Sequence, residues 1–225
     1  MDIMAQQNHP IGANTLSIIL KVSSATIGRE LLFLEANGNI EKISNKGRIL
    51  TSQGFHTYEF YSREQRLQQS TMKLIQSISE GDIDRLCNIL DTRMIIEKET
   101  ARLATIKMHS DDLSKLKIII QQQKINIASG GVGDQSDIEF HELIAHLSGN
   151  DVLENIIRLI MTNHDVYHRT ISYIHYKMME HPSFSHDAIL KEFEKKNSNK
   201  AAEAMYQHLS NLKQDVLAVR SKKKV

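Results

Sequence analysis

The chain has 225 residues, a formal net charge of +1, two prolines, ten glycines and no tryptophan. This length permits one large domain or two smaller ones, and the near-zero charge excludes a polycation, so that any contact with nucleic acid requires a local basic patch. The single Cys87 excludes an intrachain disulfide framework and fits a reducing cytoplasm, and no apolar run of about 18 residues predicts a membrane span. We therefore expect a cytoplasmic protein without a membrane partner.

The first region, residues 1–54, mixes short helical patterns with a strand-like end. In chain order, the expected elements are a helix over 13–21, a helix over 25–36, a strand over 40–43, a turn over 44–47 and a strand over 48–51. Ser23 or Ser24 is a suitable cap for the second helix, and Gly38 suits its end. Helix, tight turn, helix and hairpin is the layout of a winged helix-turn-helix, which predicts a DNA-binding domain.

The second region is helical throughout. The segment 55–67 is interpreted as a linker. The residues after it predict an all-α domain over 68–225. The expected helices cover 63–79, 82–107, 110–127, 135–147, 150–176, 183–196 and 199–218. The sequence thus predicts a mainly α protein, with an N-terminal winged helix-turn-helix followed by a bundle of six or seven helices.

Four side chains of this helical region form a candidate metal site. Asp137 and His141 are four residues apart, so they share one face of a helix. His186 lies eleven residues before Asn197, and His208 lies ten residues after Ser198. Because the turn between the last two helices is expected at 197–199, these near-equal intervals bring the two imidazoles level in an antiparallel hairpin.

One carboxylate and three imidazoles suit a divalent ion such as Zn²⁺, Ni²⁺, Co²⁺, Mn²⁺ or Fe²⁺, with coordination positions left open for a ligand. The alternative is a surface pair, because a lone Asp-x-x-x-His motif on a helix is usually no more than that.

The N-terminal pattern resembles the winged helix of GntR transcription regulators. The residues that carry the resemblance run from Pro10-Ile11-Gly12 through Leu16, Leu20-Lys21-Val22-Ser23-Ser24-Ala25-Thr26-Ile27-Gly28-Arg29-Glu30-Leu31 and Leu34-Glu35-Ala36-Asn37-Gly38. Ser24 and Gly28 stand where the family usually carries arginines, and the first helix of the motif is reduced to about residues 1–7.

The C-terminal region resembles the FCD effector domain of the FadR subfamily, over roughly residues 68–218. The matching residues include Arg93-x-x-Ile96-Glu97, Asp137-x-x-Phe140-His141-x-x-Ile144-Ala145-x-x-Ser148-Gly149-Asn150, His186-x-x-Ile189 and His208-Leu209. The resemblance implies a metal held by Asp137, His141, His186 and His208, with a small organic acid completing the site. Further candidates for holding such a carboxylate effector are Arg93, His164, His168 and Arg169. The alternative is a surface salt bridge for either arginine and a solvent-facing side chain for either histidine.

The expected DNA contacts lie at the start of the second helix and on the wing. They are Ser23, Ser24, Thr26, Arg29, Lys42, Lys46 and Arg48. Arg29 is the best candidate for reading a guanine, and the wing residues suit phosphate contacts, although a solvated basic hairpin is the alternative. Such DNA-binding domains usually act in pairs on an operator DNA with twofold symmetry, which implies a homodimer.

Two other functions compete with an effector-controlled regulator. A helical metalloenzyme would use the same His and Asp side chains, but the sequence supplies no recognisable general base, nucleophile or phosphate loop, so an enzyme is not expected. A regulator that senses the metal ion itself is the other alternative, and metal titration with and without organic acids separates it from an effector-controlled one.

Overall fold

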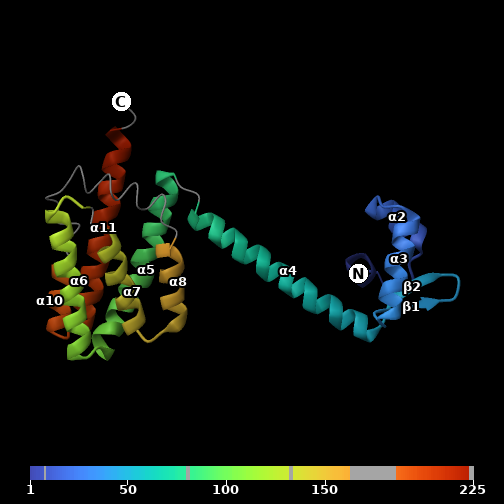
Figure 1. The fold of residues 1–225 in the computed structure, drawn as a ribbon, viewed down its shortest axis with the longest axis horizontal. Helices are drawn as coiled ribbons and strands as arrows, with labels where there is room; N and C mark the ends of the chain where they lie inside the picture. The colour runs from blue at the N-terminus through green and yellow to red at the C-terminus, as the bar shows by residue number, and fades with distance from the viewer. Residues whose placement is uncertain (8, 80–81, 132–133, 163–185, 223–225) are drawn as a thin grey trace. The chain divides into compact units, whose positions relative to one another are not determined.

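A computed structural model describes residues 1–7, 9–79, 82–131, 134–162 and 186–222. The chain divides into two compact units, Met1–Leu74 and Ile75–Val225. Each unit is described by itself, and the ribbon of Figure 1 shows the helices and strands within each.

The first unit is a winged helix-turn-helix. Its elements are α1 Asp2–Ala5, α2 Ala13–Leu20, α3 Ser24–Ala36, β1 Ile40–Ile43, β2 Gly47–Leu50 and the part of the long α4 Ser52–Ser79 up to Leu74. Ser23 is the N-cap of α3, and its hydroxyl accepts a hydrogen bond from the amide of Thr26. A small core holds these elements together, built from Met4, Ile11, Leu16, Ile27, Leu31 and Ile40.

The wing is a two-stranded antiparallel hairpin. Ile43 pairs with Gly47, so three residues connect the strands and not the four expected, and Gly47 begins β2. Gly47 has a φ of +122°, and a Cβ there would overlap the backbone of Ile11, which forms an isolated antiparallel bridge with Arg48. Glycine at this position therefore permits both the turn and the close approach of the preceding loop.

Helix α4 runs through the segment predicted as a linker. Residues 55–67 lie inside Ser52–Ser79, so the expected helix start at residue 63 was wrong and the segment interpreted as a linker is helical. The reason lies in the cap: the hydroxyl of Thr51 accepts a hydrogen bond from the amide of Gly54 and donates one to the carbonyl of Gly38. The cap starts the helix directly after β2 and fastens it to the end of α3.

The second unit is a helical bundle. Its described helices are α5 Ile83–Lys107, α6 Ser110–Ala128, α7 Asp134–Leu147, α8 Asp151–Thr162, α10 Asp187–Glu194 and α11 Ser198–Lys222. Helix α5 contacts α7, α8 and α11, while α6 contacts α7 and α10. These bounds match the expected helices within a few residues, and the part of the expected helix 150–176 beyond Thr162 lies outside the described residues. The fold class predicted from sequence is confirmed.

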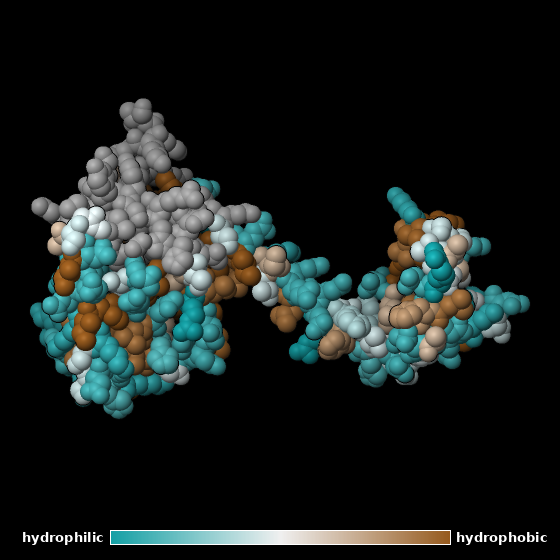
Figure 2. All heavy atoms as spheres, viewed as in Figure 1, coloured by the Kyte–Doolittle hydropathy of each residue, from teal (hydrophilic) through white to brown (hydrophobic). Residues whose placement is uncertain are grey.

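The interior of the bundle is aliphatic with two phenylalanines. Its fully buried members include Leu86, Leu90, Leu116, Phe140, Ile144, Ile189, Phe193, Met205 and Leu209. Figure 2 shows a mostly hydrophilic surface with scattered apolar areas on the visible face of the bundle. Within the described ranges, no helix combines the length and apolar character needed to span a membrane.

Gly54→Ala tests the contact between α4 and the turn after α3. A Cβ at Gly54 would overlap the carbonyl oxygen of Asn39, so backbone must move, and we expect a loss of about 1–3 kcal/mol in the stability of the first unit. Hydrogen exchange followed by mass spectrometry on peptides from residues 1–74 measures this loss.

Gly28→Ala is the matched control, because this second helical glycine has no neighbouring atom within 4 Å of an added Cβ. Alanine there should stabilise α3 by up to about 1 kcal/mol. Equal exchange rates in the two variants would contradict the packing argument.

Candidate metal centre

Helix α7 presents Asp137 and His141 to the interior of the bundle. The two residues are one turn apart, and Phe140 and Ile144 on the same side of the helix are fully buried in the core. Asp137 and His141 therefore lie on the packed face of this amphipathic helix and are themselves buried.

The α10–α11 hairpin supplies the other two imidazoles. His186 is the N-cap of α10, and His208 lies three turns into α11. Lys196, with a φ of 52°, turns the chain between the two helices. The ring centroids of His186 and His208 are 4.6 Å apart, so the two side chains are level, as the near-equal intervals from the turn predicted.

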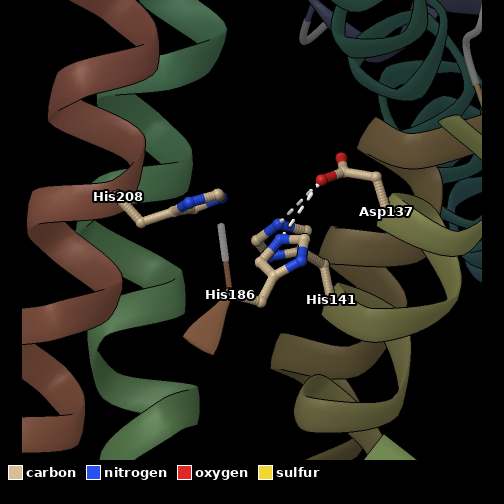
Figure 3. A group of neighbouring side chains, drawn as sticks. All are labelled: Asp137, His141, His186 and His208. Atoms are coloured by element: carbon tan, nitrogen blue, oxygen red, sulfur yellow. Dashed lines mark ion pairs between the residues drawn. The ribbon is translucent and has the colours of Figure 1, made fainter. Parts of the chain in front are cut away.

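The structure brings all four predicted ligands together (Figure 3). Oδ1 of Asp137 is 3.3 Å from Nε2 of His186 and 3.7 Å from Nε2 of His141. One ligand atom from each of the four residues lies within 4.8 Å of all the others. Ligands about 2.0–2.1 Å from one tetrahedral Zn²⁺ are roughly 3.3 Å apart, so small side-chain movements bring this set onto one ion.

Several histidine ring nitrogens in this cluster lack hydrogen-bond partners among the described residues. Among the described residues, Nε2 of His141, Nε2 of His186 and both ring nitrogens of His208 are buried without a hydrogen bond of normal geometry. Buried polar atoms without partners cost free energy, and several nitrogens facing one carboxylate oxygen are the donors that a divalent transition metal takes. The residues present therefore fit the ion that the sequence predicts.

Two further polar side chains stand behind the histidines. Glu97 of α5 makes an ion pair through Oε2 with Nδ1 of His141, and Oε1 of Gln123 in α6 is 2.9 Å from Nδ1 of His186. Glu97 and Gln123 were not among the predicted site residues. Their only sequence signal is a polar residue at a core-facing helical position, and for Glu97 its place in the quoted FCD motif.

Arg93 is part of the same buried cluster. Its Nε donates to Oε1 of Glu97 at 2.5 Å, and neither side chain is more than 1% exposed. Arg93 was predicted to hold an effector carboxylate, and the structure places it against Glu97. His164, His168 and Arg169, predicted for the same role, lie outside the described residues.

Burial and neighbouring charge act against each other in this cluster. Burial by itself raises the pKa of Glu97, but Arg93 and His141 outweigh it and lower this pKa to about 2. Burial likewise raises the pKa of Asp137, while His141 and His186 bring it well below its usual range. Both carboxylates are therefore charged at neutral pH.

The three imidazoles differ in their protonation. Burial lowers the pKa of His141, but the charges of Glu97 and Asp137 outweigh it, so this pKa is raised. Burial lowers the pKa of His186, and burial together with the other two histidines lowers that of His208 far below its ordinary value. Neutral His186 and His208 offer lone pairs, which metal binding requires.

The residues predicted to contact DNA separate into exposed and engaged positions. Ser23, Ser24 and Arg29 are exposed at the start of α3, and Lys42 and Lys46 are exposed on the wing. Thr26 is half-buried, and its hydroxyl is 2.9 Å from that of Ser23 within the cap. The start of α3 and the wing are therefore accessible to a DNA duplex.

Arg48 has a different environment. Its Nε donates to Oε2 of Glu35 at 2.9 Å, and only 18% of its side chain is exposed. This ion pair joins β2 to α3, so the Arg48 side chain connects the wing to the recognition helix in addition to any DNA contact.

Comparison with known proteins gives consistent matches. Residues 88–211 match the FCD domain model. The Exu regulon transcriptional regulator of Escherichia coli (strain K12) is 25% identical over 201 residues, covering 85% of this chain and 69% of that protein. The Uxu operon regulator of Haemophilus influenzae is 29% identical over 133 residues, which cover 56% of this chain and 48% of that regulator.

A solved structure shares the fold. The GntR family member from Pseudomonas syringae pv. tomato superimposes with a TM-score of 0.51 at 18% identity, covering 96% of this chain and 78% of that one. At this identity the likeness shows the fold alone.

The lowered pKa of Glu97 predicts how the stability of the metal-free protein depends on pH. The lowering from 4.5 to about 2 corresponds to a stabilisation on the order of 3 kcal/mol. This contribution is fully present above pH 4.5 and is lost as the pH falls toward 2. Since Glu97→Gln cannot titrate, its stability deficit against the wild type should shrink between about pH 4.5 and pH 2.

Urea unfolding in a chelator, followed by circular dichroism, measures this deficit. Glu99→Gln is the control, because Glu99 forms a similar ion pair with Arg102 on the exposed side of α5. A deficit for Glu97→Gln that stays constant across the pH range would contradict the assignment.

Proposed function

Since this chain belongs to the FCD-domain regulators of the GntR family, we propose that it is a sequence-specific DNA-binding regulator controlled by a small carboxylate at a metal centre. The observation that carries the proposal is the convergence of Asp137, His141, His186 and His208 in the interior of the effector domain. The exposed start of α3 and the wing supply the DNA-binding surface.

Asp137 and the three imidazoles are the residues that would hold the ion. A divalent Zn²⁺, Ni²⁺ or similar ion supplies a Lewis-acid centre with positions open to an oxygen ligand. An ion held by these four residues would offer further coordination to oxygen donors of an organic acid. A carboxylate with a neighbouring hydroxyl or carbonyl oxygen would suit such an ion.

Charge balance favours an effector with a single negative charge. Glu97 and Asp137 each carry one negative charge, Arg93 carries one positive charge, and a divalent ion adds two. Counted over these three described side chains and the ion alone, the net charge is then +1. Because an uncompensated charge in a buried site is costly, one monocarboxylate neutralises the group better than a dicarboxylate does.

The DNA-binding part of the proposal rests on the exposed side chains of the first unit. Arg29 on α3 has the donors that read guanine O6 and N7, and Lys42 and Lys46 on the wing suit phosphates. A single small head binds weakly, so we propose a homodimer whose two heads read an inverted repeat.

Coupling between the effector domain and DNA binding tests the proposed function. Operator DNA is first selected from a random library by the full-length protein. With Zn²⁺-loaded protein, a panel of monocarboxylates should contain a compound that changes operator affinity by about 5–150-fold, while chelated protein and His208→Ala show no response. His146→Ala is the control, because this exposed histidine on α7 pairs only with Glu154 among the described residues and should respond as the wild type does.

The outcomes separate the alternatives. A response to Zn²⁺ alone, with none to any carboxylate, makes the protein a metal sensor. A carboxylate response that survives chelation and His208→Ala places the effector site elsewhere and overturns the proposal.

Arg29→Ala and Lys46→Ala test the two kinds of DNA contact. Arg29→Ala should cost about 1–3 kcal/mol at one base pair of each half-site and relax the preference there. Lys46→Ala should weaken binding to all sequences and lower the salt dependence of the affinity by about one counterion. Titrations of selected and random DNA at several salt concentrations measure both effects, and identical behaviour of the two variants would refute these roles.

A further inference from the structure

Among the described residues, two of the three candidate histidine ligands have an oxygen acceptor behind the ring, and the third has none. The carboxylate of Glu97 contacts Nδ1 of His141, and the amide oxygen of Gln123 contacts Nδ1 of His186. Neither nitrogen of His208 has a hydrogen-bond partner among the described residues. The acceptors come from α5 and α6, which contribute no ligand of their own.

These contacts determine which nitrogen of each ring faces the ion. An acceptor at Nδ1 favours the tautomer with the proton on that nitrogen and leaves the Nε2 lone pair free. Nε2 of both rings lies on the side of Asp137, at 3.7 Å for His141 and 3.3 Å for His186. Both rings are thus oriented before any ion arrives.

The two acceptors differ in charge. Glu97 is an ionised carboxylate, and its other oxygen accepts a hydrogen bond from Arg93, so Arg93, Glu97 and His141 form a buried chain that ends at the site. Gln123 offers His186 only a neutral amide oxygen. A carboxylate behind an imidazole increases the electron donation of that imidazole to a metal more than an amide does.

We propose that Glu97 and Gln123 are positioning residues that act on the metal through His141 and His186, and that the charged Glu97, held by Arg93, has the larger effect on metal affinity. This inference rests on the proposed metal site. It gives Arg93 a role at the centre that does not depend on the effector.

Zn²⁺ affinity, measured by competition with a chromophoric chelator, tests the inference in the full-length protein. Glu97→Gln should weaken Zn²⁺ binding by about 10–100-fold, whereas Gln123→Glu should strengthen it by up to about 10-fold, because it places a carboxylate behind His186 as well. Glu99→Gln changes a charged residue of the same helix on its exposed side and should leave the affinity unchanged.

The Co²⁺ absorption spectrum separates a positioning residue from a ligand. Saturated Glu97→Gln should keep the visible bands of the wild type, since all four ligands remain, while His208→Ala should alter them. Gln123→Met removes the acceptor without touching the pair of Arg93 and Glu97, and it should lose about 10-fold in Zn²⁺ affinity. Circular dichroism shows whether Glu97→Gln folds. If it does not, Gln123→Met takes its place in the test.

Wild-type affinity in folded Glu97→Gln or Gln123→Met would overturn the inference, and so would a changed Co²⁺ spectrum in Glu97→Gln, which would make Glu97 a ligand. Failure of the wild-type protein to bind Zn²⁺ or Co²⁺ would instead overturn the proposed metal site on which the inference depends.

Discussion

Inside the bundle, the carboxylate of Glu97 lies between the guanidinium of Arg93 and the imidazole of His141, and none of the three is more than 1% exposed. Burying a charge in an apolar interior is costly unless an opposite charge or hydrogen bonds compensate it. Arg93 and Glu97 come from α5, and His141 comes from α7, so this compensation requires the two helices to pack in one register. The same register places Asp137 one turn before His141, beside the hairpin that carries His186 and His208. The contact between Glu97 and His141 thus links the candidate ligands on α7 to the buried pair on α5.

The centre draws its groups from several parts of the chain. Its candidate ligands belong to α7, the N-cap of α10 and α11, and the side chains behind them belong to α5 and α6. Because these elements meet only in the packed bundle, binding an ion at this position would stabilise the folded domain against the unfolded chain. Binding would also supply partners for ring nitrogens that have none among the described residues.

In the first unit, close backbone contacts determine how the elements pack against one another. Gly47 lets the loop at Ile11 pair with the wing, and Gly54 lets α4 start against the turn after α3. The hydroxyl of Thr51 caps α4 and donates a hydrogen bond to the carbonyl of Gly38, which holds α4 against the turn after α3. The beginning of α4 is therefore continuous with the DNA-binding head, and a rotation of this part of the helix carries the head with it.

Local pattern was sufficient for much of this protein. Helical periodicity, the Ser23 cap and the strand pattern of the wing predicted the fold class, since these features depend on neighbours along the chain. The motif at Asp137 and the intervals around Asn197 predicted which side chains are neighbours within each pair, because a helix and a tight hairpin impose fixed distances. The resemblance to the FCD domain implied that the two pairs meet. The tertiary structure decided three other points. It made residues 55–67 helical through contacts of Thr51 and Gly54 with the distant turn at 38–39, and it engaged Arg48 with Glu35. It also placed Glu97 and Gln123 behind the histidines. Each of these depends on residues that only packing brings together, and sequence spacing does not report such contacts.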